Sequence, residues 1–132
     1  MISRRAGVAL GVGDLVTAGL VAFGVFGALP TRWAVVDVPA AVLVLLHLGS
    51  AAGLLTGKPW APRAATVASA VSLALGLLVI TVLAMTAGWL SGVYGPVGRG
   101  GAVILALVAA LVLPYLVAAP VARLVWLRGA RA

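Results

Sequence analysis

Four polar side chains stand inside long apolar stretches of this sequence, and they are the residues best suited to chemistry: Asp14, His47, Ser72 and Tyr115. An ionisable residue inside a membrane is energetically costly and is by default a candidate functional residue. A buried aspartate beside a histidine could bind and release a proton. One interpretation is therefore a proton or ion site to which each of four helices contributes one polar group.

Whether Asp14 meets His47 depends on where the second apolar segment becomes helical. If that helix begins at Ala34, the preceding turn centres near Thr31, and residues 14 and 47 face each other. If the helix begins at Pro39, His47 shifts toward the middle of the membrane by about one helical turn, and the contact is strained. The sequence leaves both registers open.

The polar residues also have a structural interpretation, which we favour. Hydrogen bonds between membrane helices hold the helices together and contribute about 0.6 kcal/mol each on average. Under a third interpretation, Asp14 stays protonated and donates a hydrogen bond to a backbone carbonyl.

No cofactor, metal site or enzymatic activity is predicted. A haem between membrane helices commonly needs a pair of axial histidines, and the chain has one histidine. The chain has no cysteine, which excludes thiolate metal sites and cysteine nucleophiles. The HExxH and GxSxG patterns of zinc proteases and serine hydrolases do not occur, and Ser72 with His47 would be a dyad without a supporting pattern.

Composition indicates which elements position these residues. Hydrophobic residues make up 64% of the chain and charged residues 8%, and the mean hydropathy is +1.28. A soluble domain carries about 25% charged residues. Nine basic and two acidic residues cannot cover the surface of a soluble protein of 132 residues. The sequence therefore predicts an all-α integral membrane protein with a single domain over residues 1–132.

Four apolar runs predict four transmembrane helices, at about residues 8–29, 35–56, 64–90 and 100–127. Each reaches or approaches the roughly 20 residues that cross a bilayer core, and none alternates as a membrane barrel strand does. An antiparallel up-down bundle is expected. Gly57 should cap the second helix, Pro62 should lie in the first turn of the third, and the glycine-rich segment 91–101 should form the last loop.

Basic residues predict that both termini face the cytoplasm. With the N-terminus inside, seven basic residues fall on the cytoplasmic side and two, Arg32 and Arg99, on the outer side; the seven are Arg4, Arg5, Lys58, Arg63, Arg123, Arg128 and Arg131. This bias follows the positive-inside rule and predicts a multi-pass protein of the cell membrane, of the bacterial inner-membrane kind. The basic residues are scattered singly and form no stripe, so nucleic acid is not an expected partner.

Small residues mark the faces on which the helices are expected to pack. Spacings of four, three and four residues place four residues on one face of the first helix: Gly7, Gly11, Asp14 and Ala18. Gly49 and Gly53 form a GxxxG pair in the second helix, and Gly88 and Gly92 form another at the end of the third. Such pairs let helix backbones approach closely in lipid, within one chain or between subunits.

Pro114 and Pro120 interrupt the fourth predicted helix. Each removes a backbone N–H and crowds the carbonyl group four residues earlier. Membrane helices tolerate this where neighbouring groups satisfy the backbone. A kink is therefore predicted, either as a fixed shape or as a hinge.

Two classes of function remain open from the sequence. The first, which we favour, is a structural or accessory subunit that packs in the lipid bilayer against other subunits or against copies of itself. The alternative is a small homo-oligomeric proton-coupled transporter that uses Asp14. Short loops and small-residue faces favour the first class, whereas a carboxylate inside the first helix favours the second.

Overall fold

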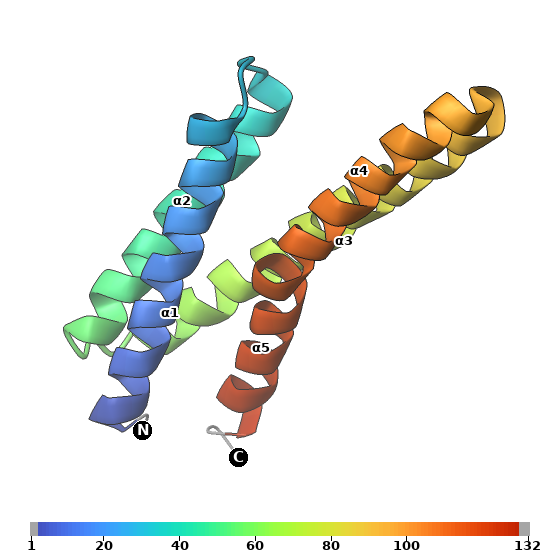
Figure 1. Ribbon diagram of the computed structural model, residues 1–132. Coiled ribbons are helices and arrows are strands. Elements are labelled where there is room, and N and C mark those ends of the chain that lie inside the picture. The colour runs from blue at the N-terminus through green and yellow to red at the C-terminus, as the bar shows by residue number, and fades with distance from the viewer. Residues whose placement is uncertain (1–2, 130–132) are drawn as a thin grey trace. The chain divides into compact units, whose positions relative to one another are not determined.

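A computed structural model describes residues 3–129 of the chain, and this range is almost entirely helical and contains no strand (Figure 1). Four helical stretches in it are long and apolar enough to cross a membrane: Arg4–Ala28, Ala34–Leu55, Ala61–Val93 and Gly95–Gly129. The prediction of four long apolar helices is confirmed, and the last two are longer than the predicted spans 64–90 and 100–127. Arg131, which contributes to the predicted charge bias, lies outside the described residues.

Two of the four stretches change helix type along their length. The elements in chain order are α1 (Arg4–Ala22), the π-helix η1 (Phe23–Ala28), α2 (Ala34–Leu55), α3 (Ala61–Val93), α4 (Gly95–Leu113), the π-helix η2 (Pro114–Ala118) and α5 (Ala119–Gly129). The contacts divide the chain into two compact units, residues 1–71 with 122–132 and residues 72–121. Each unit is described by itself below.

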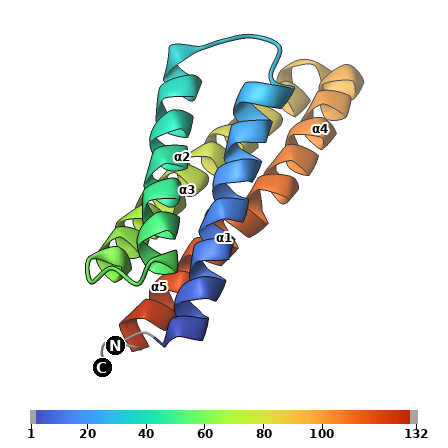
Figure 2. The same ribbon diagram turned by 90° about the vertical axis from the view of Figure 1, so that its left-hand side faces the viewer.

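The first unit is built on α1 and α2, which run side by side in opposite directions (Figure 2). The small residues of α1 allow this approach. A Cβ atom on Gly7 would lie 3.4 Å from the carbonyl oxygen of Leu54, and one on Gly11 would lie 3.0 Å from the side chain of Leu55. A larger residue at position 11 would press on Leu55, whereas 3.4 Å at position 7 is an ordinary contact distance, so the close packing depends more on Gly11.

A small apolar core closes one end of this unit. Leu54, Ala61, Ala65 and Leu127 are buried together, and Leu10 packs against them. These residues come from α1, α2, the start of α3 and α5. The core therefore holds the N-terminal end of α1 to the C-terminal end of α2.

Arg32 caps the helical end of the first stretch. Its guanidinium donates to the carbonyl oxygens of Val25, Phe26 and Leu29, at 3.0, 2.8 and 3.0 Å. The last carbonyls of a helix lack partners within it, so a cation that binds carbonyls there stabilises the helix end. Arg32 Nη1 also lies 3.7 Å from the carboxylate of Asp37, in the first turn of α2.

The turn from α2 to α3 ends the helix by the mechanism that the sequence predicts. Gly57 has a φ of +67°. Its N–H donates to the carbonyl of Leu54, and the N–H of Lys58 donates to the carbonyl of Gly53. This pair of bonds is the Schellman motif, which favours glycine at this position. The prediction that Gly57 caps the second helix is confirmed.

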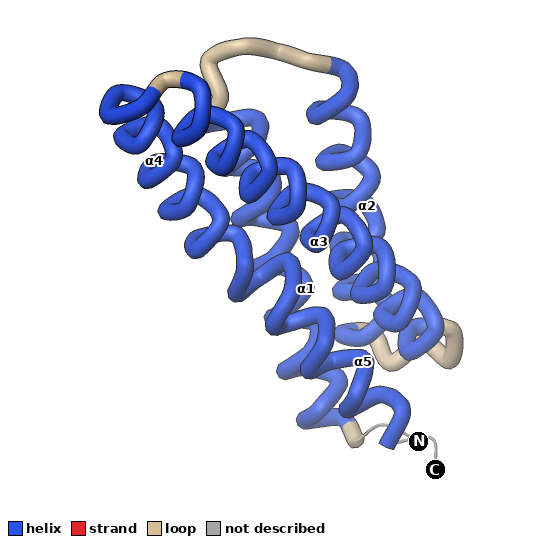
Figure 3. Tube along the Cα trace, turned by 90° about the vertical axis from the view of Figure 1, so that its right-hand side faces the viewer, coloured by secondary structure: helices blue, strands red, loops and turns tan. Residues whose placement is uncertain are grey.

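The second unit contains most of α3 together with α4 and η2, and its turn is much shorter than the sequence predicts. Helix α3 continues to Val93 and α4 begins at Gly95, so most of the expected loop at 91–101 is helical (Figure 3). The N–H of Gly98 donates to Tyr94, and a Cβ atom on Gly98 would overlap the carbonyl of Leu90. Gly98 therefore allows α3 and α4 to approach closely. The prediction that this glycine-rich segment forms a loop is wrong for most of its length.

The predicted interruption of the fourth stretch lies in η2, which begins at Pro114. Pro114 has no N–H to donate to the carbonyl four residues earlier. The helix widens here, and the N–H of Ala119 donates to the carbonyl of Pro114, five residues earlier. Gly76 of α3 lies against this segment, because a Cβ atom on it would overlap the backbone of Leu116. Pro120 is the second residue of α5.

Candidate functional site

The carboxylate of Asp14 is the centre of a buried polar cluster in the first unit. Asp14 is only 1% exposed. Its Oδ1 lies 2.7 Å from Nδ1 of His47, and its Oδ2 accepts a hydrogen bond of 2.6 Å from the hydroxyl of Ser50. His47 and Ser50 are fully buried as well. Asp14 thus ties α1 to α2 through two side chains of α2.

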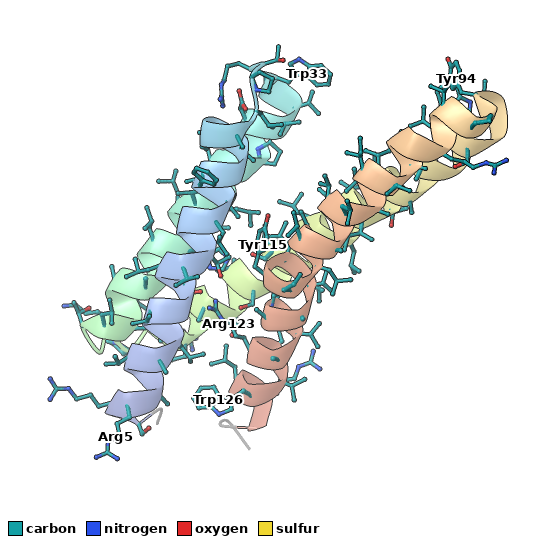
Figure 4. The ribbon with its side chains drawn as sticks, viewed as in Figure 1. Arg5, Trp33, Tyr94, Tyr115, Arg123 and Trp126 are labelled. Atoms are coloured by element: carbon teal, nitrogen blue, oxygen red, sulfur yellow. The ribbon has the colours of Figure 1, made fainter. Side chains whose placement is uncertain are left out.

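A fourth member, Arg123, reaches the same carboxylate from α5. Its Nη1 donates to Oδ1 of Asp14, and the two side chains are 13% and 1% exposed. Figure 4 shows Arg123 extending from α5, in the same unit as α1. Gly13 makes room for the guanidinium, because a Cβ atom there would overlap Nη2 of Arg123. One carboxylate therefore links three helices, α1, α2 and α5.

The start of α2 fixes the register that brings His47 to Asp14. Of the two registers considered above, the structure has the one in which the helix begins at Ala34. Asp37 lies in the first turn of this helix. A negative charge there interacts favourably with the helix dipole and stabilises the helix start. Ser50 lies three residues after His47, so both project from the same face of α2.

The cluster contains one carboxylate, which forms an ion pair and accepts hydrogen bonds. An ionised carboxylate only accepts hydrogen bonds, so the Nδ1–H of His47 donates to it when Asp14 is charged. Arg123 supplies the compensating positive charge. Both oxygens of Asp14 are engaged, one by two donors and one by a single donor. Over residues 3–129, no group of three or more His, Cys, Asp or Glu residues could hold a metal ion.

The other two predicted polar residues belong to the second unit. Ser72, in α3, is fully buried, and Tyr115 lies in η2. That these two residues join Asp14 and His47 in one site stays a prediction.

The predicted packing residues differ in their surroundings. Gly7, Gly11, Asp14 and Ala18 are all buried, and they occupy the face of α1 that meets α2. Gly53 lies under the ring of Trp60, which a Cβ atom would approach to 2.7 Å. Gly49, Gly88 and Gly92 have open space where a Cβ would point, so a packing role for them requires a partner outside the described chain.

Sequence reasoning missed Arg123 and Ser50. Arg123 was assigned to the cytoplasmic flank because it lies close to the end of the last apolar run. It nevertheless falls inside the predicted span 100–127, and a charge within a span should have a partner in the protein interior. Its only possible acidic partners are Asp14 and Asp37, so a search for charge pairs would have raised the contact with Asp14.

Comparisons of this chain with protein-family models, with curated proteins and with solved structures find no match.

Proposed function

We propose that the chain is a small membrane-spanning protein that functions through helix packing, as a structural or accessory subunit. The observation that carries this proposal is the bonding of Asp14. Its two carboxylate oxygens contact three polar side chains of α2 and α5. A group bonded in this way ties helices together. Because the cluster joins α1, α2 and α5, these helices can present their outer faces to a partner as one unit.

A role in packing agrees better with this geometry than proton transport does. A proton carrier must bind and release a proton at an accessible acceptor. Asp14 is 1% exposed, and its carboxylate is bonded to the guanidinium of Arg123. A transported proton would have to reach a buried carboxylate whose two oxygens are both engaged already.

The open glycines of α3 support a partner in the membrane. Gly88 and Gly92 lie four residues apart and therefore on one face of the helix. Neither has an atom within 4 Å of the position a Cβ would take. In lipid, faces of this kind let a second helix approach closely. The proposed partner is a transmembrane helix of another subunit or of a second copy.

Purification in a mild detergent tests this proposal, with partner identification and mass measurement by native mass spectrometry. We expect a defined complex that Gly92→Leu disrupts while helicity is retained. Gly19→Leu is the matched control, because Gly19 also has open surroundings but lies in α1. A chain that runs as a monomer, or a complex unaffected by Gly92→Leu, would contradict the proposal.

We further propose that the four stretches cross the membrane alternately, with both termini on the cytoplasmic side. The charge bias of seven against two basic residues supports this orientation. The chain lacks cysteine, so single cysteines can be labelled without background. Lys58→Cys should react with an impermeant maleimide only after the membrane is opened, whereas Arg99→Cys should react in intact cells. The reverse pattern would place the termini outside.

A proton-coupled transporter that uses Asp14 is the second candidate. It is favoured by the direct contact of 2.7 Å between Asp14 and His47, because such a pair within an apolar span is costly without a use. A cavity of about 390 Å³, lined by Arg123 and Trp126 among others, borders the cluster.

Proton flux in liposomes separates the two candidates. The transporter predicts flux that Asp14→Asn abolishes and that Asp37→Asn leaves intact. Asp37 is the matched control, since it is the only other acidic residue and pairs with Arg32 at the opposite end of α2. Absence of flux with every tested substrate, from protein of verified helicity, would exclude this alternative.

A further inference from the structure

A large basic cavity lies at the end of the first unit where α1 begins and where α2 turns into α3. Its volume is about 1050 Å³, slightly above the range of roughly 300–1000 Å³ typical of ligand pockets. The N-terminus of α1 and the α2–α3 turn lie at this same end in both views (Figures 1 and 2). All the residues that line it belong to the first unit.

Three cations border this cavity, and over residues 3–129 no acidic side chain lines it or pairs with them. They are Arg4, Lys58 and Arg63. Within residues 3–129, Asp14 pairs with Arg123 and His47, and Asp37 pairs with Arg32. The positive potential of the cavity is therefore available to an external anion.

Apart from Ser3 and Thr56, the other side chains at the cavity wall are apolar. Val8 of α1, Leu55 of α2 and Leu127 of α5 contribute side chains to it. A free inorganic anion would gain nothing from such a wall, whereas the upper part of an acyl chain would bury apolar surface against it. The cations suit the phosphate of a phospholipid, and the apolar side chains suit its acyl chain.

We propose that this cavity binds one anionic phospholipid, with its phosphate among Arg4, Lys58 and Arg63 and its upper acyl chain against the apolar wall. This inference goes beyond the proposed role in helix packing and shares with it only the placement of the chain in a membrane. Trp60 follows Lys58 and Pro59 in the same turn and is 49% exposed. Tryptophan prefers the membrane–water interface, which places this turn at headgroup depth.

Binding of phosphatidylglycerol to the full chain in a neutral detergent tests the proposal. Native mass spectrometry would count the bound lipids, and phosphatidylcholine and inorganic phosphate would serve as comparison probes. We expect one phosphatidylglycerol per chain, bound at least tenfold more tightly than phosphatidylcholine and not displaced by millimolar phosphate. Equal binding of both lipids would overturn the proposal, and displacement by phosphate would assign the cavity to free anions.

Two variants test the site itself. A cation near a membrane surface strengthens binding of an anionic lipid by about fivefold, so Arg4→Gln, Lys58→Gln and Arg63→Gln combined should weaken phosphatidylglycerol binding at least tenfold. The matched control replaces Arg5, Arg99 and Arg128, which do not line the cavity, and should change binding less than about threefold. If the control loses as much affinity for phosphatidylglycerol, the effect comes from the net charge of the protein, and the proposed site is wrong.

The apolar wall has a test that leaves every charge in place. Val8→Trp adds an aromatic ring to the cavity wall and should displace the acyl chain, which lowers affinity for phosphatidylglycerol at least fivefold. Circular dichroism and the melting temperature verify that each variant folds. Undiminished binding by a folded Val8→Trp protein would contradict the proposed position of the acyl chain.

Discussion

Replacement of Arg123 by glutamine is the most direct test of the buried cluster. The substitution removes the positive charge that faces Asp14 but leaves His47 and Ser50 bonded to the carboxylate. Asp14 is 1% exposed, so water cannot compensate its charge. Loss of one partner from a buried ion pair costs about 3–5 kcal/mol, and the two remaining donors favour the lower end of this range, about 3 kcal/mol.

A double-mutant cycle separates the ion pair from ordinary packing. Asp14→Asn should also destabilise the protein, because it leaves the guanidinium of Arg123 without a carboxylate. With both residues neutral, no uncompensated charge remains, and the loss should be about 2 kcal/mol smaller than the sum of the single losses. Reversible unfolding in mixed micelles measures these free energies, and the exposed Arg128→Gln is the control. A loss below about 1 kcal/mol for Arg123→Gln, or strict additivity, would refute the buried pair.

Three further substitutions test individual contacts by the same unfolding measurement. Ser50→Ala should cost about 0.6 kcal/mol, the average for a hydrogen bond between membrane helices. A loss above about 2 kcal/mol would contradict the view that Ser50 contributes one ordinary hydrogen bond. Gly13→Ala should push Arg123 off Asp14 and destabilise by about 1–2 kcal/mol, whereas Gly19→Ala, in open surroundings, should be neutral or stabilising. Gly98→Ala should lower the melting temperature because it overlaps the backbone of Leu90, at a cost of about 1–3 kcal/mol, while the open Gly100→Ala should not.

The features that sequence reasoning predicted correctly are those set by local chemistry. An apolar run of sufficient length becomes a helix in lipid whatever its neighbours are, and a glycine followed by Lys-Pro ends a helix by a motif of adjacent residues. The segment 91–101 shows the limit of this approach. Its glycines resemble a loop, but Gly98 serves the approach of α4 to Leu90, which depends on a residue outside the local pattern.

The candidate site could be predicted only in part, because its contacts are distant in the sequence. Asp14 and His47 could be paired by register, since a single turn joins their two helices. Arg123 lies 109 residues from Asp14, and its position depends on the path of the two helical stretches between α2 and α5. Counting charges near span ends therefore assigned it to the membrane surface.

The doubly neutral variant Asp14→Asn with Arg123→Gln also distinguishes the two candidate functions. If the cluster holds helices together for assembly with a partner, the stability that this variant recovers relative to either single variant should restore assembly as well. If Asp14 carries protons, the same variant has no carboxylate at this position and its flux should stay absent although its stability recovers. Because stability and activity move together in one case and apart in the other, measuring complex formation, flux and unfolding on the same preparations decides between them. Recovery of flux by the doubly neutral variant would exclude Asp14 as the proton carrier.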